Sequence, residues 1–452
     1  MRLRDLAGRR VAVWGFGREG RAAIRAIRAA LPQQPLALYC REDEAAAARA
    51  FDPVLTVYGQ TPGSVALCAY DMVVKSPGIP IYQPEIAVAQ AQGTVFTSGT
   101  ALWFGENPAA RVVAITGTKG KSTTTAFVAH LARSLGVRTA LAGNIGLPLL
   151  ELQGQAAELW AVELSSFQTG EAGAVELGVV TSLYEEHLDW HGTRERYVAD
   201  KLKLADVSRT LLVNGLQDNL LAHVAAHPRR LLFGQPDGWH VAGGAIHRGD
   251  ERVFELGAMT APGEHNALNA CAALAALETM GFDARRAAPA LATFQALPHR
   301  LQRLGERDGL AFVNDSISTT PKATRAALES LAGREVTVIV GGHDRGLDWS
   351  EFVAAVKDRA RLRIVAQGAN GPRIALALRQ ARASVPLGEA ESFDEAVAMA
   401  CTVTPQGGVV LLSPGAPSFD QFKDYAARGR RFAELAGFDA AAIAGIAGLG
   451  IH

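Results

Sequence analysis

Short runs of apolar, often branched residues alternate with longer Ala- and Arg-rich stretches through most of the chain. Gly, Ser or Asn follows each run closely, and the runs are Val11–Trp14, Met72–Val74, Val112–Ile115, Leu211–Val213, Val336–Val340 and Val409–Leu412. Continuous apolar runs of this length are typical of strands that are buried on both faces. Their alternation with helical stretches predicts an α/β protein with mostly parallel sheets.

Two turn-rich stretches interrupt this alternation. The segment 104–109 reads Phe-Gly-Glu-Asn-Pro-Ala and precedes the apolar run at Val112–Ile115. Near Leu297–Arg300 a helical pattern ends before a new run at Leu310–Val313. Since a domain averages roughly 150 residues, a chain of 452 residues accommodates about three domains. We therefore predict three α/β domains, over residues 1–107, 108–299 and 300–452.

Composition and charge exclude several classes of protein. Lys and Arg together number 45, as do Asp and Glu, so no overall field attracts nucleic acid or an anionic membrane. The four cysteines lie far apart, which predicts free thiols rather than a zinc site or disulfides. The N-terminus lacks the apolar core of a signal peptide, and no apolar run reaches about 18 residues. We expect a cytoplasmic protein whose partners include neither nucleic acid nor a membrane.

The first glycine-rich loop follows the predicted strand Val11–Trp14. Gly15, Gly17 and Gly20 form the pattern G-x-G-x-x-G between a strand and a helix. Such glycines let the backbone approach a pyrophosphate at the positive end of a helix. The motif alone fits NAD binding, UDP-sugar binding or close packing. Cys40 and Arg41 follow the second strand where an acidic residue is expected, which disfavours NAD.

The strongest local signal is the loop that follows Val112–Ile115. It reads Gly-Thr-Lys-Gly-Lys-Ser over residues 117–122 and opens a helix, although the first glycine of the full P-loop pattern is missing. Backbone N–H groups from Thr118 to Ser122 are suited to wrap phosphate oxygens. Lys121 supplies a positive charge to the β- and γ-phosphates, and the Ser122 hydroxyl is suited to ligate Mg²⁺. The loop predicts binding of a nucleoside triphosphate but does not fix the reaction.

Polar residues follow two further apolar runs of the same region. Glu163 ends a strand-like run, which places a carboxylate where Mg²⁺ beside a P-loop needs one. His187 and Asp189 lie in a short polar segment, where His187 is a candidate metal or substrate ligand. The segment Tyr197–Lys203 is a predicted helix with two lysines, for which the pattern alone indicates a solvated face.

Taken together, these motifs resemble the ATP-binding core of the Mur ligase family. The matching segments are Gly117–Ser122, Glu163–Gln168, His187–Asp189, the Lys201 helix, Gly263–Asn269 and Leu297–Arg300. Three further segments resemble the glutamate-adding branch in particular, and these are Asn314–Ser316, Gly341–Gly346 and Leu412–Lys423. The matches occur in order over nearly the whole chain, from residue 11 to about residue 436.

The resemblance implies a fold and a reaction. The fold has an N-terminal Rossmann-like domain for a UDP substrate, a central P-loop ATPase domain with a mostly parallel sheet, and a C-terminal Rossmann-like domain for an amino acid. ATP phosphorylates the carboxylate of UDP-N-acetylmuramoyl-L-alanine, and the amine of glutamate displaces phosphate from the acyl phosphate. Activation is needed because a carboxylate is a poor electrophile. Two Mg²⁺ ions would offset the repulsion between the anionic groups. We expect a monomer.

The resemblance also assigns roles to residues. Lys121, Glu163, His187 and Lys201 are implied to be catalytic, and Ser122, Glu163, His187 and Lys201 to be metal ligands. Lys201 aligns with a lysine that is carbamylated in the family, which would turn a cation into an anion able to hold Mg²⁺. The implied ATP contacts are Gly117, Thr118, Lys119, Gly120, Lys121, Ser122, Thr123, Asn266, Asn269, Arg300 and Asp315. The implied UDP-muramoyl contacts are Gly15, Gly17, Ser76 and Asn144, and the other implied substrate contacts are Ser165, Gln168, Thr319, Arg345, Ser418 and Tyr425.

Two departures from the usual pattern bear on the stereochemistry of glutamate. Ile317 stands where D-glutamate-adding members have lysine after Asn-Asp-Ser, and the segment around His187 departs from Asp-His-Leu-Asp-Arg. Both features resemble the branch that adds L-glutamate and passes its product to a separate epimerase. On this resemblance we favour L-glutamate. The D-glutamate reaction is the alternative, because the two stereoisomers carry the same charges and the charge pattern does not distinguish them.

Three other hypotheses remain open to test. A folylpolyglutamate-type ligase shares the central core, but the glycine-loop domain at residues 1–107 argues against it. A non-ligating, nucleotide-gated binding module would bind ATP without releasing phosphate. An NAD dehydrogenase would bind NADH, which the P-loop disfavours.

Overall fold

The computed structural model describes residues 1–184, 191, 193–261, 263–441 and 445–452. The chain divides into two compact units. One unit contains residues 1–259, 265–294 and 448–452, and the other contains residues 260–264 and 295–447. The predicted α/β class with mostly parallel sheets is confirmed. Among the described residues, no helix has both the length and the apolar character that a membrane span requires.

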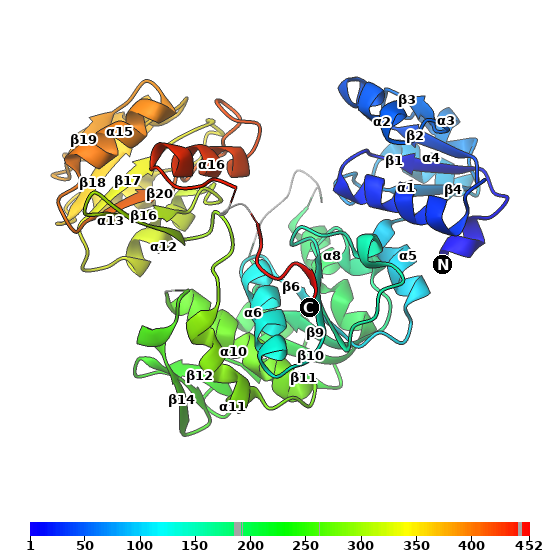
Figure 1. Ribbon diagram of the computed structural model, residues 1–452, viewed down its shortest axis with the longest axis horizontal. Helices are drawn as coiled ribbons and strands as arrows, with labels where there is room; N and C mark the ends of the chain where they lie inside the picture. Colours follow the sequence, from blue (N-terminus) through cyan, green and yellow to red (C-terminus); the bar gives the residue numbers. More distant parts are fainter. Residues whose placement is uncertain (185–190, 192, 262, 442–444) are drawn as a thin grey trace. The chain divides into compact units, whose positions relative to one another are not determined.

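The first sheet is parallel and has the strand order β3-β2-β1-β4-β5 (Figure 1). Its strands are β1 (Val11–Trp14), β2 (Leu36–Tyr39), β3 (Thr56–Tyr58), β4 (Met72–Lys75) and β5 (Val95–Thr97). The helices are α1 (Arg18–Ala30), α2 (Ala45–Phe51), α3 (Ser64–Cys68), α4 (Pro84–Ala91) and α5 (Gly99–Glu106). Residues of α1 pack on one face of β1 and β2, and residues of α3 and α4 pack on the other. The strand order reverses between β1 and β4, and open α/β sheets bind ligands at such a switch point.

The second sheet has the order β11-β10-β9-β6-β8-β7-β21. Its parallel strands are β6 (Val112–Thr116), β7 (Thr139–Gly143), β8 (Leu159–Glu163), β9 (Val175–Val180), β10 (Ser208–Asn214) and β11 (Arg230–Phe233). The accompanying helices are α6 (Lys121–Ser134), α8 (Arg194–Val207), α9 (Asp218–His223), α10 (Glu264–Thr279) and α11 (Ala284–Ala287). The strand β6, which leads into the P-loop, lies between β9 and β8 and is buried along its whole length.

Two features of this region were not predicted. An antiparallel sheet is formed by β12 (Trp239–Ala242), β13 (Ala245–Arg248) and β14 (Glu251–Glu255). The last strand, β21 (Gly450–Ile451), pairs antiparallel with β7. The predicted third domain extended to residue 452, whereas these last residues belong with the second sheet. The other predicted domain limits stay predictions.

The third sheet has the order β15-β16-β20-β17-β18-β19. Its strands are β15 (Gln302–Arg307), β16 (Leu310–Asn314), β17 (Val336–Val340), β18 (Leu362–Ala366), β19 (Leu387–Glu389) and β20 (Val409–Leu412), and only β15 is antiparallel to its neighbour. The helices are α12 (Pro321–Ser330), α13 (Ser350–Val356), α14 (Gly371–Gln380), α15 (Phe393–Val403) and α16 (Tyr425–Leu435). Carboxyl ends of the neighbouring strands β16, β20 and β17 therefore meet at one edge.

One hydrophobic core runs from the first sheet into the second. It joins residues of α1 and β1 to Trp103 of α5 and to Trp160 of β8. The Trp103 ring is fully buried, and its centroid lies 4.6 Å from that of Trp160. Buried tryptophans contribute large apolar areas to a core. Their shared burial explains why the first two sheets form one compact unit.

Candidate active site

The loop after β6 has the geometry of a phosphate cradle. Gly117 has φ +145°, and a Cβ there would lie 2.1 Å from the Thr181 Oγ1. Gly120 has φ +85°, and a Cβ there would lie 2.4 Å from the Asn269 Oδ1. Both positions therefore require glycine, for backbone conformation and for space. The Lys121 Nζ donates to the Gly117 carbonyl at 2.9 Å, so the predicted phosphate-binding amine lies over the loop.

Glu163 ends β8, the strand beside β6, and its side chain is only 1 % exposed. Its Oε1 accepts a hydrogen bond from the Asn144 Nδ2 at 2.9 Å. Its Oε2 is buried and has no hydrogen-bond partner among the described residues. Leaving a buried carboxylate oxygen unsatisfied is costly, and a bound cation is one way to offset that cost. The structure thus brings together Glu163 and Asn144, two residues predicted for the site.

Lys201 lies on α8, with 2 % of its surface exposed. Its Nζ donates to the Gly117 carbonyl at 3.1 Å, which is the same oxygen that Lys121 contacts. The Lys201 Nζ also lies 4.9 Å from the centroid of the Tyr197 ring. The Tyr197 hydroxyl is 2.8 Å from the Thr118 Oγ1, so α8 is held against the loop at two points. The interpretation of these lysines from pattern alone, a solvated face, is wrong for Lys201.

The other residues of this region that were predicted for the site differ in their surroundings. Ser165 and Gln168 are buried and bond to one another, with 2.9 Å between Oγ and Oε1, so they form a brace after Glu163. The Asn269 Nδ2 is 3.5 Å from the Asn266 Oδ1, and Asn269 lies beside Gly120. Their substrate and nucleotide roles stay predictions. His187 and Asp189 lie outside the described residues.

At the switch point of the first sheet, three of the four predicted UDP-muramoyl contacts meet, and the fourth, Asn144, lies beside Glu163. Gly15 has φ +103°, and a Cβ on it would lie 2.6 Å from the Ser76 Oγ. The Ser76 amide donates to the Trp14 carbonyl at 2.8 Å, and the buried Ser76 Oγ has no partner among the described residues. Gly17 precedes α1 as its N-cap. The structure therefore brings Gly15, Gly17 and Ser76 together where β1 and β4 end.

Sequence reasoning missed two acidic groups beside this switch point. Burial and the nearby Glu171 raise the pKa of Glu19 to about 7. The Glu171 Oε1 lies 3.6 Å from the Nζ of the buried Lys75. Burial likewise raises the pKa of Glu171, against the opposing effect of Lys75. Glu19 lies within the G-x-G-x-x-G pattern. An acidic residue is unexpected beside an anion-binding loop, and that signal could have identified it from the sequence.

In the third sheet, the predicted glutamate-site residues follow adjacent strands. Thr319, Arg345 and Ser418 come after β16, β17 and β20. The Ser418 Oγ is buried and has no partner among the described residues, and the Arg345 guanidinium lies 6.0 Å from the centroid of the exposed Phe419 ring. Tyr425 opens α16, and its carbonyl accepts from the Ser316 Oγ at 2.8 Å.

Asp315 lies in a buried cluster within the second unit, close to Leu301. The Asp315 carboxylate accepts hydrogen bonds from the Leu301 amide at 3.1 Å and from the Ser413 Oγ at 2.7 Å. Burial raises the pKa of Asp315 to about 6. The Nε of Arg300 is buried without a partner among the described residues. The geometry gives Asp315 a role in fixing the chain at Leu301, and its nucleotide contact stays a prediction.

Arg428 on α16 is a further residue that sequence reasoning missed. Its side chain is 1 % exposed, and its guanidinium donates to the Ser316 Oγ and to the carbonyls of Ser316, Ala416 and Pro417. Burial lowers the pKa of Arg428 to about 10. Its planar fork of donors fastens the loop after β16 to the loop after β20. The sequence does not single out Arg428, because several arginines lie in the same helix and the pattern does not show which one is buried.

Comparison with known families agrees with this arrangement. Residues 115–277 match the Mur ligase middle domain, and residues 299–415 match the Mur ligase glutamate ligase domain. The chain belongs to the Mur ligase family. The resemblance inferred from its motifs is confirmed, and the matched regions contain the P-loop and the loops that follow β16 and β17.

Relatives within the Mur ligase family match along the full length. The chain is 50 % identical to a UDP-N-acetylmuramoyl-L-alanine–L-glutamate ligase of Xanthomonas campestris pv. campestris (strain 8004), with 100 % of both chains covered. It is 41 % identical to a protein of the same name from Salinispora tropica, with 96 % of this chain and 98 % of that one covered.

Solved Mur ligase structures share the fold. The UDP-N-acetylmuramate–alanine ligase of Thermotoga maritima matches with a TM-score of 0.61 at 20 % identity, over 95 % of this chain and 99 % of that one. The MurF ligase of the same organism, in complex with ADP, matches with a TM-score of 0.57 at 16 % identity, over 82 % and 97 %.

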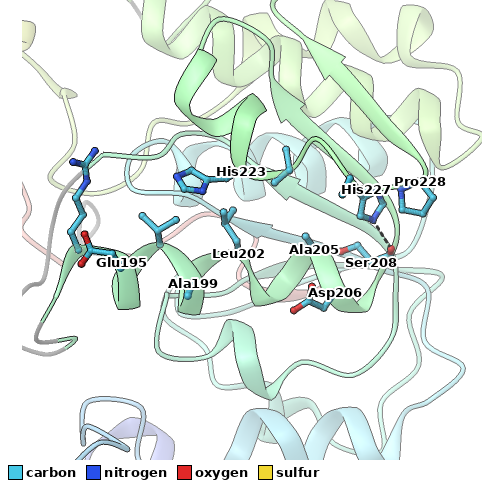
Figure 2. A pocket seen from close by; sticks show the side chains of 13 residues that line it. Glu195, Ala199, Leu202, Ala205, Asp206, Ser208, His223, His227 and Pro228 are labelled. Carbon is cyan, nitrogen blue, oxygen red and sulfur yellow. Dashed lines mark hydrogen bonds between the residues drawn. The ribbon is translucent and has the colours of Figure 1, made fainter.

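A separate hollow of about 780 Å³ lies beside α8 in this Mur ligase. Figure 2 shows α8 residues such as Glu195 and Leu202 on one side and His223 and His227 on the other. The His227 Nε2 is 3.1 Å from the Ser208 carbonyl. None of the residues predicted for the site lines this hollow.

Proposed function

We propose that this chain is an ATP-dependent ligase that adds L-glutamate to UDP-N-acetylmuramoyl-L-alanine in peptidoglycan synthesis. Full-length identity of 50 % to ligases named for this reaction carries the proposal. The P-loop beside a buried carboxylate gives it a physical basis. We expect a monomer.

ATP would bind at the loop after β6. Its phosphates would contact residues 117–123, including Lys119 and Thr123. In this structure the Thr118 and Lys119 amides donate to the carbonyl and the Oγ of Ser182, each at 2.8 Å, and the Lys121 amine donates to the Gly117 carbonyl. Asn266 and Asn269 on α10 lie beside Gly120 and would face the adenosine part. On the family resemblance, Arg300 and Asp315 are also expected to contact ATP.

The residues at the loop fit Mg²⁺. The Glu163 Oε2 is a buried carboxylate oxygen without a partner among the described residues, and Ser122 stands at the start of α6 with a hydroxyl to offer. Among the described residues no cluster of three or more His, Cys, Asp or Glu side chains is placed to hold a metal, so further ligands must come from elsewhere. Two Mg²⁺ ions would reduce the repulsion between the terminal phosphate and the substrate carboxylate. His187 would be a further ligand.

Lys201 would supply one of the missing anionic groups. A buried ammonium ion is costly to desolvate, and beside a metal it would also repel the cation. Addition of the neutral Lys201 amine to CO₂, with loss of one proton, gives a carbamate with a negative charge. The burial of Lys201 and its contact with the Gly117 carbonyl support this modification at that position.

In the reaction, an oxygen of the muramoyl-alanine carboxylate attacks the γ-phosphorus of ATP, and ADP leaves. The amine of glutamate then attacks the acyl carbon and loses a proton, and phosphate leaves as the amide forms. Lys121 would stabilise the negative charge that is transferred in the first step. Gly15, Gly17, Ser76 and Asn144 would hold the UDP-muramoyl part.

Glutamate would bind at the carboxyl ends of β16, β17 and β20. Arg345 would pair with a carboxylate of the amino acid, and Thr319, Ser418 and Tyr425 would complete the site. Ile317 in place of a lysine supports L-glutamate, because the site lacks the cation that accompanies D-glutamate binding in the resembling branch. Addition of D-glutamate is the alternative, and an L-glutamate product would be passed to an epimerase.

The decisive experiment is a phosphate-release assay with ATP, Mg²⁺ and UDP-N-acetylmuramoyl-L-alanine, run separately with L- and D-glutamate. We expect stoichiometric ADP, phosphate and dipeptide product with L-glutamate, identified by mass spectrometry. Turnover with D-glutamate alone would replace the L-glutamate proposal with its alternative. ATP that stays intact with either enantiomer would refute the ligase function.

A further inference from the structure

Tyr82 connects the first sheet with the helix that carries Lys201. It lies in the loop between β4 and α4, six residues after Ser76. Its hydroxyl lies 2.6 Å and 2.7 Å from the two carboxylate oxygens of Asp200. Asp200 is the residue directly before Lys201 on α8. The guanidinium of Arg196, also on α8, lies 4.4 Å from the centroid of the Tyr82 ring.

Asp200 is a buried centre to which several groups donate. Its side chain is 7 % exposed, and it pairs with the His191 Nδ1 at 2.8 Å and with the Lys203 Nζ at 2.7 Å. A buried carboxylate needs such donors to offset its desolvation, and together they fix its position. The Asp200 carbonyl also accepts from the Thr169 Oγ1 at 2.6 Å, which fastens the backbone beside Lys201.

His191 extends these contacts toward the strand of Glu163. Because a carboxylate only accepts hydrogen bonds, we assign the proton to the His191 Nδ1. The Nε2 then accepts from the Ser166 Oγ at 3.0 Å. The His191 ring is fully buried and stacks on Phe167, with 5.4 Å between centroids. Ser166 lies three residues after Glu163, so the hydrogen bonds that start at Tyr82 end on the segment that follows Glu163.

We infer that Tyr82 is a positioning residue that aligns the Lys201 helix with the bound UDP substrate. This inference rests on the proposed function. A substrate held at Gly15 and Ser76 orders the loop that ends at Tyr82, and the Tyr82–Asp200 contact passes that order to the backbone of Lys201. Phosphoryl transfer depends on close alignment of the reacting groups, because a displacement of about 1 Å can lower the rate by a large factor. Tyr82 itself touches neither reacting group.

The variant Tyr82→Phe removes only the hydroxyl that reaches Asp200. We expect kcat to fall roughly 5- to 50-fold, with the KM values for ATP and glutamate within twofold of wild type. The matched control is Tyr70→Phe, which removes a phenol contact to Tyr39 that stays within the first sheet. We expect wild-type kinetics for this control and a single cooperative unfolding transition for both variants. A wild-type kcat for Tyr82→Phe, or an equal loss in Tyr70→Phe, would overturn the inference.

Two further readouts separate alignment from general damage. In the absence of ATP, UDP-N-acetylmuramoyl-L-alanine should slow amide hydrogen exchange over residues 194–207 of the wild type, and Tyr82→Phe should lose at least half of that protection. Equal protection in both proteins would refute the coupling. The kinetic effects of Tyr82→Phe and Asp200→Asn should also overlap, so that the double variant is no slower than the slower single variant, and fully multiplicative losses would refute it.

Failure of this inference is distinguishable from failure of the proposed function. If the wild type forms no dipeptide product, the proposed function fails. The exchange experiment uses no ATP and no glutamate, so it measures the coupling without any turnover. A wild type that turns over while Tyr82→Phe behaves identically in every assay would overturn the inference alone.

Discussion

The two glycine-rich loops of the first unit have the same backbone plan and different chemistry. Each follows a buried strand and opens a helix, and each has a glycine with positive φ that admits no Cβ, Gly15 in one and Gly120 in the other. Lys121 and Lys201 contact the P-loop, and the neighbouring strand β8 ends at Glu163, whose Oε2 has no hydrogen-bond partner among the described residues. The first loop is flanked instead by Glu19, a carboxyl whose pKa burial raises to about 7.

This difference indicates that the loop geometry suits the binding of an anion. The side chains around the loop determine whether the bound phosphate group is transferred. Transfer of a phosphoryl group needs positive charge and a metal at the transferred group. A pyrophosphate that is only held needs hydrogen-bond donors such as backbone N–H groups and no added negative charge beside it, and Glu19 adds none while it is protonated. The predictions below test this division of roles.

The largest effect is expected for Lys121→Ala. Removing the cation over the P-loop should lower kcat about 10³-fold, a magnitude typical for the loss of a charge that stabilises phosphoryl transfer. Binding of the UDP substrate, measured by calorimetry, should stay within twofold of wild type, because the first loop holds it. Residual activity above a tenth of wild type would contradict the assignment of chemistry to the second loop.

Lys201→Ala is expected to lower kcat roughly 10²- to 10³-fold through loss of an anionic ligand. A small carboxylic acid should restore part of the activity by standing in for the carbamate. Lys203→Ala on the same helix is the control, since Lys203 is 48 % exposed and bonds to Asp200 rather than to the P-loop, and we expect at most a few-fold loss. Full activity of Lys201→Ala would remove the carbamate from the proposal.

A smaller and more selective effect is expected for Gly15→Ala. The added Cβ would approach the Ser76 Oγ in a backbone conformation that L-residues rarely adopt. The KM for the UDP substrate should rise roughly tenfold, and the KM for ATP should not change. Gly63→Ala in the same region is the control, because a Cβ at Gly63 meets nothing within 4 Å. A rise in the KM for ATP instead would break the comparison of the two loops.

The smallest effect concerns stability and pH. The pKa of Glu19 is about 7 in the folded chain against 4.5 for an ordinary glutamate. Between these values the folded state holds a proton that the unfolded state releases, so stability falls as pH rises from 4.5 to 7 and is level outside that window. The loss is at most about 3 kcal/mol.

Glu19→Gln should remove that part of the pH dependence. Urea unfolding at pH 5 and pH 8 should then show that the variant gains stability relative to wild type at pH 8 and little at pH 5. The exposed Glu42 provides the control in Glu42→Gln, for which we expect wild-type behaviour at both pH values. If Glu19→Gln and the wild type lost the same stability between pH 5 and pH 8, Glu19 would be ionised beside the first loop.

Local patterns predicted most of the sheets because they report burial directly. Each apolar run from Val11–Trp14 to Val409–Leu412 became a strand, and the loop at Gly117–Ser122 has the expected form. The antiparallel strands β12, β13 and β14 were not predicted, since they are only partly buried and lack a continuous apolar run. Lys201 was ambiguous from pattern alone, because a lysine in a helix gives no sign of which face is buried.

The sequence by itself determined the family, the α/β class and the P-loop, because these depend on residues that are close together along the chain. Only the tertiary structure decided which distant groups meet. Tyr82 and Asp200 are 118 residues apart, and β21 joins β7 from the far end of the chain. The raised pKa of Glu19 likewise arises from burial by other segments. Such pairings and buried environments result from the packing of whole elements, for which no local pattern encodes the partner.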